Sequence, residues 1–227
     1  MRPTVFLFDI DGTLVSTGGA GRRSIERAFA EHIGRTDVVD FPFAGMTDPA
    51  IVRLGLTRAG RDADADAIAA VLAIYLRTLE EEVAAAERFV VHEGVQETIA
   101  TVAGWERSAI GLGTGNVRDG ARVKLGRARL FESFAFGGFG CDSEERAELL
   151  RVGAERGAAR LGLPRAECRV VVIGDTPKDV AAALKIGAEA FGVGTGPYTA
   201  EDLMACGATR AFRTLTAEGA IEALREG

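Results

Sequence analysis

The sequence predicts an α/β fold in which a parallel sheet forms the core and an all-helical segment is inserted near the N-terminus. Apolar runs typical of buried strands lie at residues 4–8, 108–113, 169–174 and 188–194, with a weaker candidate at 135–138. Stretches with helical spacing lie at residues 117–130, 145–161 and 177–186. Strands that alternate with helices form βαβ units, and these build a parallel sheet covered on both faces.

The segment 16–92 interrupts this alternation. Residues 18–34 and 65–89 are amphipathic at helical spacing, and no convincing strand separates them. The segment is too long for an ordinary crossover between two parallel strands. We therefore expect a core domain formed by residues 1–15 and 93–227 and a helical cap domain formed by residues 16–92. The natural hinge points between them are Thr17, Gly18 and Gly19 on one side and His92, Glu93 and Gly94 on the other.

Composition excludes several classes of protein. The chain has 227 residues, of which 47% are hydrophobic, so a substantial core can be buried. Its net charge is −6 with the signs interspersed, whereas a nucleic-acid interface needs clustered Lys and Arg. The three cysteines are far apart, which argues against a zinc site or a disulfide framework. No signal peptide or membrane span is indicated. We expect a cytoplasmic monomer or homodimer with no nucleic-acid or membrane partner.

Two aspartates, Asp9 and Asp11, stand one residue apart where the first strand ends. Side chains at positions i and i+2 of a strand point to the same side, so the two carboxylates converge. At a separation of about 4 Å they repel by roughly 4 kcal/mol at an effective dielectric constant near 20. A proton or a cation would relieve this repulsion, and Mg²⁺ suits oxygen ligands. The alternative is that both aspartates are simply solvated at a turn.

Two further motifs follow predicted strands. In GDTPKD, residues 174–179, Asp175 ends a strand and Asp179 lies in the first turn of the next helix. In LGTGN, residues 112–116, Thr114 offers a hydroxyl and Gly115 an unhindered N–H, which suits an anion. Ligands of open α/β sheets bind at the carboxyl ends of the strands, where both motifs would meet Asp9. The alternative for Asp179 is a charge that complements the helix dipole.

The order DIDGT, helical insert, LGTGN and GDTPKD resembles the haloacid dehalogenase superfamily, in particular its phosphoglycolate-phosphatase-like branch. The resemblance implies a Rossmann-like core with a helical, C1-type cap. It implies that Asp9 is the nucleophile, which forms an aspartyl-phosphate, and that Asp11 is the general acid and base. It also implies a Mg²⁺ site formed by Asp9, the backbone carbonyl of Asp11, and Asp175, with Asp179 supporting it through water. Thr114 and Gly115 would bind the transferring phosphoryl group.

One position departs from the family. A Lys-Pro pair usually precedes the helix before the GD motif, and its lysine holds the nucleophile and the phosphate together. The corresponding residues 137–150, GGFGCDSEERAELL, contain neither a lysine nor a proline. Arg146 is the nearest cation, although its spacing to Asp175 is a helical turn longer than usual. Lys124 is the other candidate for binding phosphate, at the limit of its reach about 12 Å along a helix from the strand end. The sequence leaves both open.

The resemblance implies a Mg²⁺-dependent phosphatase that acts on a small-molecule phosphate monoester, with phosphoglycolate as the named candidate. The cap would cover the site and select the leaving group. The cap residues that are candidates for facing the site are Arg22, Arg23, Thr47 and Asp48. Two alternatives remain: a sugar phosphomutase that uses the same two aspartates, and a non-catalytic, receiver-like protein that senses phosphate.

Overall fold

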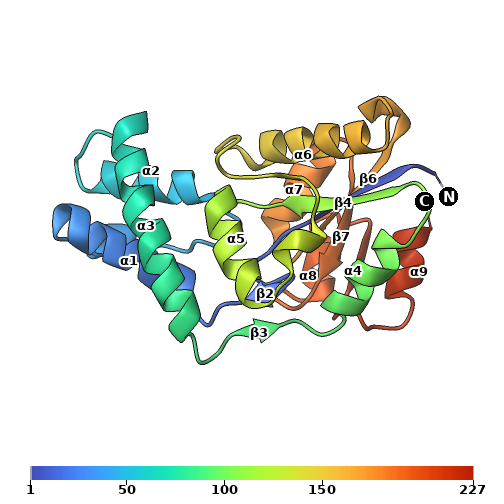
Figure 1. The fold of residues 1–227 in the computed structure, drawn as a ribbon, viewed down its shortest axis with the longest axis horizontal. Coiled ribbons are helices and arrows are strands. Elements are labelled where there is room, and N and C mark those ends of the chain that lie inside the picture. The colour runs from blue at the N-terminus through green and yellow to red at the C-terminus, as the bar shows by residue number, and fades with distance from the viewer. Residues whose placement is uncertain (1, 227) are drawn as a thin grey trace.

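The computed structural model describes residues 2–226, and its core is a six-stranded parallel sheet (Figure 1). The strand order is β5-β4-β1-β6-β7-β8, so the first strand of the chain lies inside the sheet. The strands are β1 (Thr4–Phe8), β4 (Ser108–Gly113), β5 (Gly137–Gly138), β6 (Arg169–Gly174), β7 (Glu189–Val193) and β8 (Arg210–Phe212). The three predictions at 4–8, 108–113 and 169–174 are confirmed to the residue. The weaker candidate at 135–138 shortens to two glycines, and β8 was not predicted.

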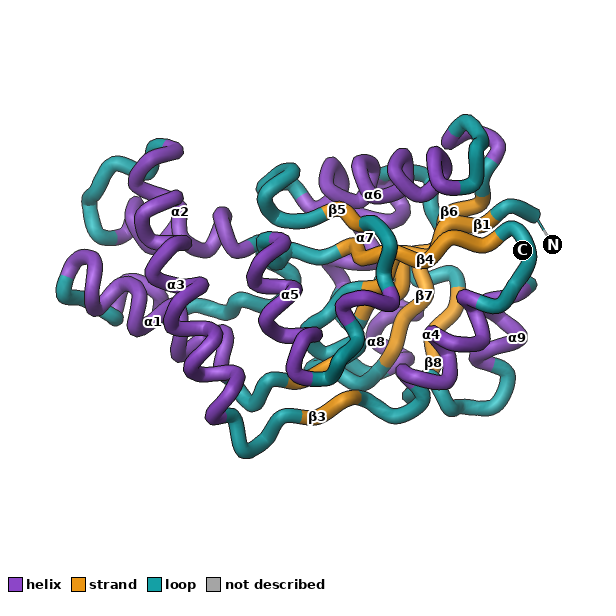
Figure 2. The backbone as a smooth tube through the Cα atoms, viewed as in Figure 1, coloured by secondary structure: helices purple, strands orange, loops and turns teal. Residues whose placement is uncertain are grey.

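Helices cover both faces of the sheet because the side chains of β1 alternate between two apolar clusters. Phe6 and Phe8 belong to one cluster, and Val5 and Leu7 belong to the other. The first cluster receives α4 (Val95–Ala103), α5 (Arg118–Arg127) and α9 (Ala220–Arg225), and the second receives α6 (Arg146–Arg160), α7 (Pro177–Lys185) and α8 (Ala200–Ala205). Figure 2 shows strands between helices on the two sides. The predicted α/β fold with a parallel sheet is therefore confirmed.

Three further helices lie to one side of the sheet, beyond the carboxyl ends of its strands (Figure 1). They are α1 (Ala20–Ile33), α2 (Asp48–Arg58) and α3 (Ala65–Ala85). A short 3-10 helix at Asp37–Val39 lies between α1 and α2, and others lie in the core at Phe131–Ser133 and Arg165–Glu167. The three helices pack around an apolar cluster of their own, which includes Phe29, Val52 and Leu79. Within residues 2–226, no helix combines the length and apolarity needed to cross a membrane.

Two short strands join the three-helix segment to the core. β2 (Val15–Ser16) and β3 (Val90–Val91) pair antiparallel, with Val15 opposite Val91. The hydroxyl of Ser16 lies 3.0 Å from Nε2 of His92, which adds a polar contact beside the pair. The two chain crossings therefore lie side by side near the predicted hinges. Two-residue strands carry too little periodicity to be predicted from the sequence.

Helix α6 packs unusually close to the sheet edge because glycines face each other across the contact. A Cβ atom on Gly138 would collide with the carbonyl group of Leu149, and one on Gly153 would lie 2.9 Å from the backbone nitrogen of Gly138. Only hydrogen at these positions lets the backbones approach so closely. This approach places the first residue of α6, Arg146, at the carboxyl edge of the sheet.

We predict that Gly138→Ala lowers the free energy of unfolding by about 1–3 kcal/mol, because the added methyl group overpacks the contact with α6. The matched control is Gly126→Ala in α5, where a Cβ atom meets nothing within 4 Å. That substitution should raise stability by about 0.5–1 kcal/mol through the smaller entropy of the unfolded chain. Chemical denaturation measures both, and unchanged stability of Gly138→Ala would contradict the close packing.

Candidate active site

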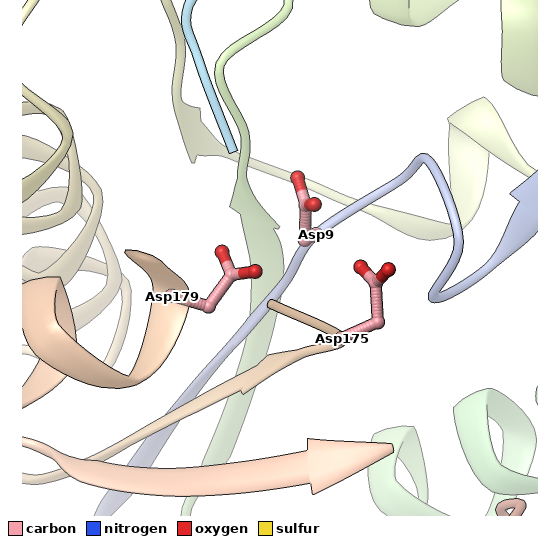
Figure 3. Close-up of side chains that lie close together, drawn as sticks. All are labelled: Asp9, Asp175 and Asp179. Atoms are coloured by element: carbon pink, nitrogen blue, oxygen red, sulfur yellow. The ribbon is translucent and has the colours of Figure 1, made fainter. Parts of the chain in front are cut away.

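Three aspartates meet at the carboxyl edge of the sheet (Figure 3). Asp9 follows β1, Asp175 follows β6, and Asp179 lies in the first turn of α7. β1 and β6 are neighbours in register, and the backbone N–H of Asp9 donates to the carbonyl of Ile173 at 2.9 Å. One carboxylate oxygen from each aspartate lies within 4.8 Å of the others, and all three side chains are buried. The structure thus brings together residues that are separated by about 170 positions in the sequence.

Burial makes this cluster electrostatically unfavourable without a cation. Burial raises the pKa of Asp9 to about 6, while the charge of Arg146 opposes that rise and those of Asp179 and Asp11 add to it. Burial, followed by the charges of Asp179 and Asp9, raises the pKa of Asp175 to about 8. Three buried carboxylates with one arginine leave an excess of negative charge. Such a set of hard oxygen donors fits a divalent cation such as Mg²⁺.

Arg146 is the cation that lies between the aspartates. Its Nε donates to Oδ1 of Asp179 at 2.7 Å, and its Nη2 lies 3.0 Å from Oδ1 of Asp9 and also contacts Asp179. The side chain is 8% exposed, and the neighbouring carboxylates raise the pKa of the guanidinium further against the opposing effect of burial. Of the two candidate cations left open by the sequence, Arg146 is therefore the one in contact with Asp9.

Lys124 also reaches the site, but it contacts a different aspartate. Its Nζ lies 2.7 Å from Oδ2 of Asp11, and the side-chain amide of Asn116 donates to the same oxygen at 2.8 Å. The carboxylate of Asp11 does not belong to the group formed by Asp9, Asp175 and Asp179 among residues 2–226. The expectation that its backbone carbonyl binds Mg²⁺ stays a prediction.

The loop after β4 carries the predicted anion-binding residues. Thr114 is fully buried, and its N–H donates to the carbonyl of Gly138 at 3.0 Å. A Cβ atom on Gly115 would collide with the carbonyl oxygen of Met46, so glycine is needed where the loop at residues 43–48 approaches. Thr114 and Gly115 line the same cavity as Asp9. Their role in binding phosphate stays a prediction.

Asp48 anchors the loop at residues 43–48 to the core. The N–H of Asp48 donates to the carbonyl of Gly115 at 2.8 Å, and Oδ2 of Asp48 accepts from the N–H of Val117 at 2.9 Å. The hydroxyl of Tyr75 lies 3.5 Å from Oδ1. Burial raises the pKa of Asp48 to about 6, although the charge of Lys124 opposes the rise. Asp48 therefore connects α2 and α3 to the N-terminus of α5.

Of the four candidate residues of the insert, two line the cavity and two do not. Asp48 and Arg22 line the cavity, and the Arg22 guanidinium lies 4.0 Å from the centre of the Phe43 ring. Arg23 and Thr47 do not line it. Arg23 pairs with Glu82 at 2.6 Å on the surface, because α1 packs along α3. The hydroxyl of Thr47 donates to the carbonyl of Glu144, so it fastens the loop instead of facing the site.

The cavity between the sheet edge and the three-helix segment has a volume of about 570 Å³. The charged residues on its wall are Asp9, Asp11, Arg22, Asp48, Lys124, Arg146 and Asp175. The insert supplies apolar side chains to the wall, including Ile25, Phe43 and Met46, together with the polar side chains of Arg22, Asp48 and Tyr75. The cavity therefore combines a polar end at the aspartates with a mixed, largely apolar end under the insert.

The loop after β7 also lines the cavity, although no motif in the sequence indicated it. The hydroxyl of Thr195 donates to the carbonyl of Gly12 at 2.6 Å, and a Cβ atom on Gly196 would collide with the carboxylate of Asp175. Both residues line the cavity. Their position directly after the predicted strand 188–194 is the signal that would have found them, since site residues gather at carboxyl ends of parallel strands.

The fold and site define an α/β protein with an acidic, cation-suited site at the carboxyl edge of a parallel sheet, covered by a helical insert. A family model described as haloacid dehalogenase-like hydrolase matches residues 3–187. The chain belongs to this family of hydrolases, and the resemblance found in its motifs is confirmed. No curated protein sequence is significantly similar to the chain.

Solved structures share the fold over the whole chain. A hydrolase from Pseudomonas syringae has a TM-score of 0.70 and 21% identity, covering 98% of this chain and 97% of its own. A predicted phosphatase from Clostridium acetobutylicum has a TM-score of 0.71 and 16% identity, covering 100% of both chains. A predicted phosphoglycolate phosphatase from Haemophilus somnus has a TM-score of 0.66 and 15% identity, covering 99% and 98%. At these identities the likeness shows a common fold.

We predict that, with a chelator present, the free energy of unfolding falls as the pH rises from about 5 to 8.5. The pKa values of Asp9 and Asp175 are raised by folding, so between pH 4 and 8 the folded state binds more protons than the unfolded state. Urea denaturation across this range measures the slope. In Asp175→Asn the free energy of unfolding should change less with pH between about pH 6 and 8. If the free energy of unfolding depended on pH in the same way in the wild-type protein and in Asp175→Asn, the inferred excess of negative charge in the cluster would be contradicted.

Proposed function

We propose that the protein is a Mg²⁺-dependent phosphatase that hydrolyses a small phosphate monoester through an aspartyl-phosphate on Asp9. The observation that carries this proposal is the position of Asp9. Its buried carboxylate lines the cavity beside Asp175 and lies 3.0 Å from a nitrogen of Arg146. A nucleophile for phosphorus, donors for phosphate oxygens and a cation-suited cluster therefore share one cavity wall.

The first displacement uses the residues around Asp9. A carboxylate oxygen of Asp9 attacks phosphorus, and the bond from phosphorus to the ester oxygen breaks. The positive charge of Arg146, which already pairs with Asp9 and Asp179, offsets the repulsion between the attacking carboxylate and the phosphate. Thr114 contributes a hydroxyl, and Gly115 a backbone N–H. A Mg²⁺ ion held by Asp9, the Asp11 carbonyl, Asp175 and, through water, Asp179 would supply further charge neutralisation.

Asp11 handles the protons in both displacements. Its carboxyl group gives a proton to the departing alkoxide in the first step. In the second step it takes a proton from water as the water oxygen attacks phosphorus and the bond to Asp9 breaks, which releases phosphate. Its side chain lines the cavity and is 45% exposed, so it is accessible to a leaving group. Division of hydrolysis into two displacements lets one carboxylate attack while the other transfers protons.

We propose phosphoglycolate as the first substrate to test. Structural likeness to a predicted phosphoglycolate phosphatase supports this choice. Arg22 adds a positive charge to the cavity wall, and its guanidinium donates to the carbonyls of Val39 and Phe41. A panel of phosphate esters, assayed with Mg²⁺ and with chelator, tests the proposal. We expect release of inorganic phosphate that requires Mg²⁺. An isomerised sugar phosphate in place of free phosphate would indicate a mutase, and no reaction with any ester would contradict a phosphatase.

We predict that Asp9→Asn abolishes turnover and leaves the fold intact, since asparagine keeps the shape of the side chain but is not a nucleophile. Phosphate release and the thermal midpoint measure the two effects. Wild-type rates for this variant would contradict the nucleophile assignment.

We predict that Arg146→Met lowers kcat/KM by about 100-fold or more, because the phosphoryl group loses its nearest charged donor. The matched control is Arg151→Met in the same helix, where the side chain forms only exposed pairs with Glu148 and Glu155. This control should change kcat/KM by less than about twofold. Equal effects of the two substitutions would show that Arg146 does not act on the substrate.

A further inference from the structure

The carboxylate of Asp11 is held by two donors that are distinct from Arg146. Nζ of Lys124 lies 2.7 Å from Oδ2 of Asp11, and Nδ2 of Asn116 lies 2.8 Å from the same oxygen. Both donors converge on one oxygen and leave Oδ1 of Asp11 without either contact. This pair of contacts fixes where the carboxylate points, and it separates Asp11 from the cluster of Asp9, Asp175 and Asp179.

Lys124 is a buried lysine that lines the cavity. Its side chain is 5% exposed, and Oδ2 of Asp11 is the hydrogen-bond acceptor that the structure gives it within residues 2–226. It extends from α5 to the start of α1, where a Cβ atom on Gly21 would lie 3.4 Å from Nζ. A buried ammonium costs free energy unless it is paired. The hydrogen bond of Lys124 goes to Asp11, and the nearby charge of Asp48 also stabilises the ammonium.

Asn116 also directs a hydrogen bond to the carboxylate of Asp11. Its Nδ2 donates to Asp11 and, at 2.9 Å, to the hydroxyl of Thr114. The carboxylate only accepts hydrogen bonds, so the amide nitrogen must face it and the amide orientation is fixed. The amide oxygen is buried and has no hydrogen-bond partner within residues 2–226. An orphaned acceptor is unfavourable for stability, which indicates that the side chain is kept for its two donated bonds.

We propose that Lys124 and Asn116 are positioning residues that hold the carboxylate of Asp11 on the leaving-group side of the cavity, ready to transfer protons. This inference rests on the proposed role of Asp11 as general acid and base. It assigns Lys124 a different task from Arg146: Arg146 faces the phosphoryl group, and Lys124 acts on the substrate only through Asp11. The cavity wall contains all three side chains of this arrangement, Asp11, Asn116 and Lys124.

Leaving groups of different acidity test the proposal. An alkyl phosphate such as phosphoglycolate needs its leaving oxygen protonated, whereas p-nitrophenyl phosphate releases a stable phenolate without help. The ratio kcat/KM reports only the steps up to release of the alcohol. We expect Lys124→Met and Asn116→Ala to lower kcat/KM by about tenfold or more for the alkyl ester, and by less than about threefold for the aryl ester. Equal losses on both esters, or no loss, would overturn the proposal.

The control is Lys185→Met, which makes the same chemical change at an exposed lysine paired with Glu145. It should leave both ratios unchanged. The thermal midpoint of each variant shows whether it folds. Asn116→Ala removes the donated bonds without leaving a buried charge unpaired, so it remains informative if Lys124→Met unfolds.

A double-mutant cycle separates action through Asp11 from direct binding of phosphate. If Lys124 acts through Asp11, the variant Asp11→Asn with Lys124→Met should be no slower on the alkyl ester than Asp11→Asn alone. Inhibition by inorganic phosphate should then change less than about twofold in Lys124→Met. Additive losses, or inhibition weakened tenfold, would overturn the proposal and make Lys124 a phosphate ligand.

A crystal structure of Asn116→Ala or Lys124→Met gives a test that is independent of turnover. We expect the carboxylate of Asp11 to leave its wild-type position in either variant. An unmoved carboxylate overturns the positioning role, whatever the activity of the enzyme. A wild-type protein that hydrolyses no ester would instead refute the proposed function, so the two failures are distinguishable.

Discussion

Like charges buried at one edge of a sheet are the constraint on which the rest of this structure depends. Three carboxylates share a space of less than 5 Å, and burial raises the pKa values of two of them, Asp9 and Asp175. Such a cluster is stable only with compensation, by protons, by Arg146 or by a metal ion. The same excess of negative charge would favour the binding of a divalent cation between the carboxylates.

The two buried cations contact different aspartates, and neither forms an ion pair with Asp175 among the described residues. Arg146 contacts Asp9 and Asp179, whereas Lys124 contacts Asp11. Arg146 comes from a helix brought close to the sheet by facing glycines, and Lys124 comes from the helix that follows the Thr114 loop. The position of each cationic side chain therefore depends on how its helix packs. The packing of these helices thereby sets the electrostatic environment of the aspartates.

The helical insert takes part in the same network. The loop before α2 rests on Gly115, and Asp48 binds the N–H of Val117, so the insert contacts the loop that carries Thr114. The insert and the loop that follows β4 are therefore physically connected at this point. In the proposed phosphatase, displacement of the insert would disturb the Thr114 loop as well as open the cavity.

The sequence by itself determined the buried strands and the acids at their ends, because apolar runs and an aspartate directly after them are local signals. It predicted Asp9, Asp175 and Asp179 at one edge, and the structure places them there. It could not predict β8 or the β2–β3 pair, whose strands are only two or three residues long. It also could not show which of Arg146 and Lys124 lies beside Asp9, or that Thr195 and Asn116 line the cavity. Only the tertiary structure decided these, because a side chain's partner depends on where separate helices and loops lie in space, and no local pattern encodes that distance.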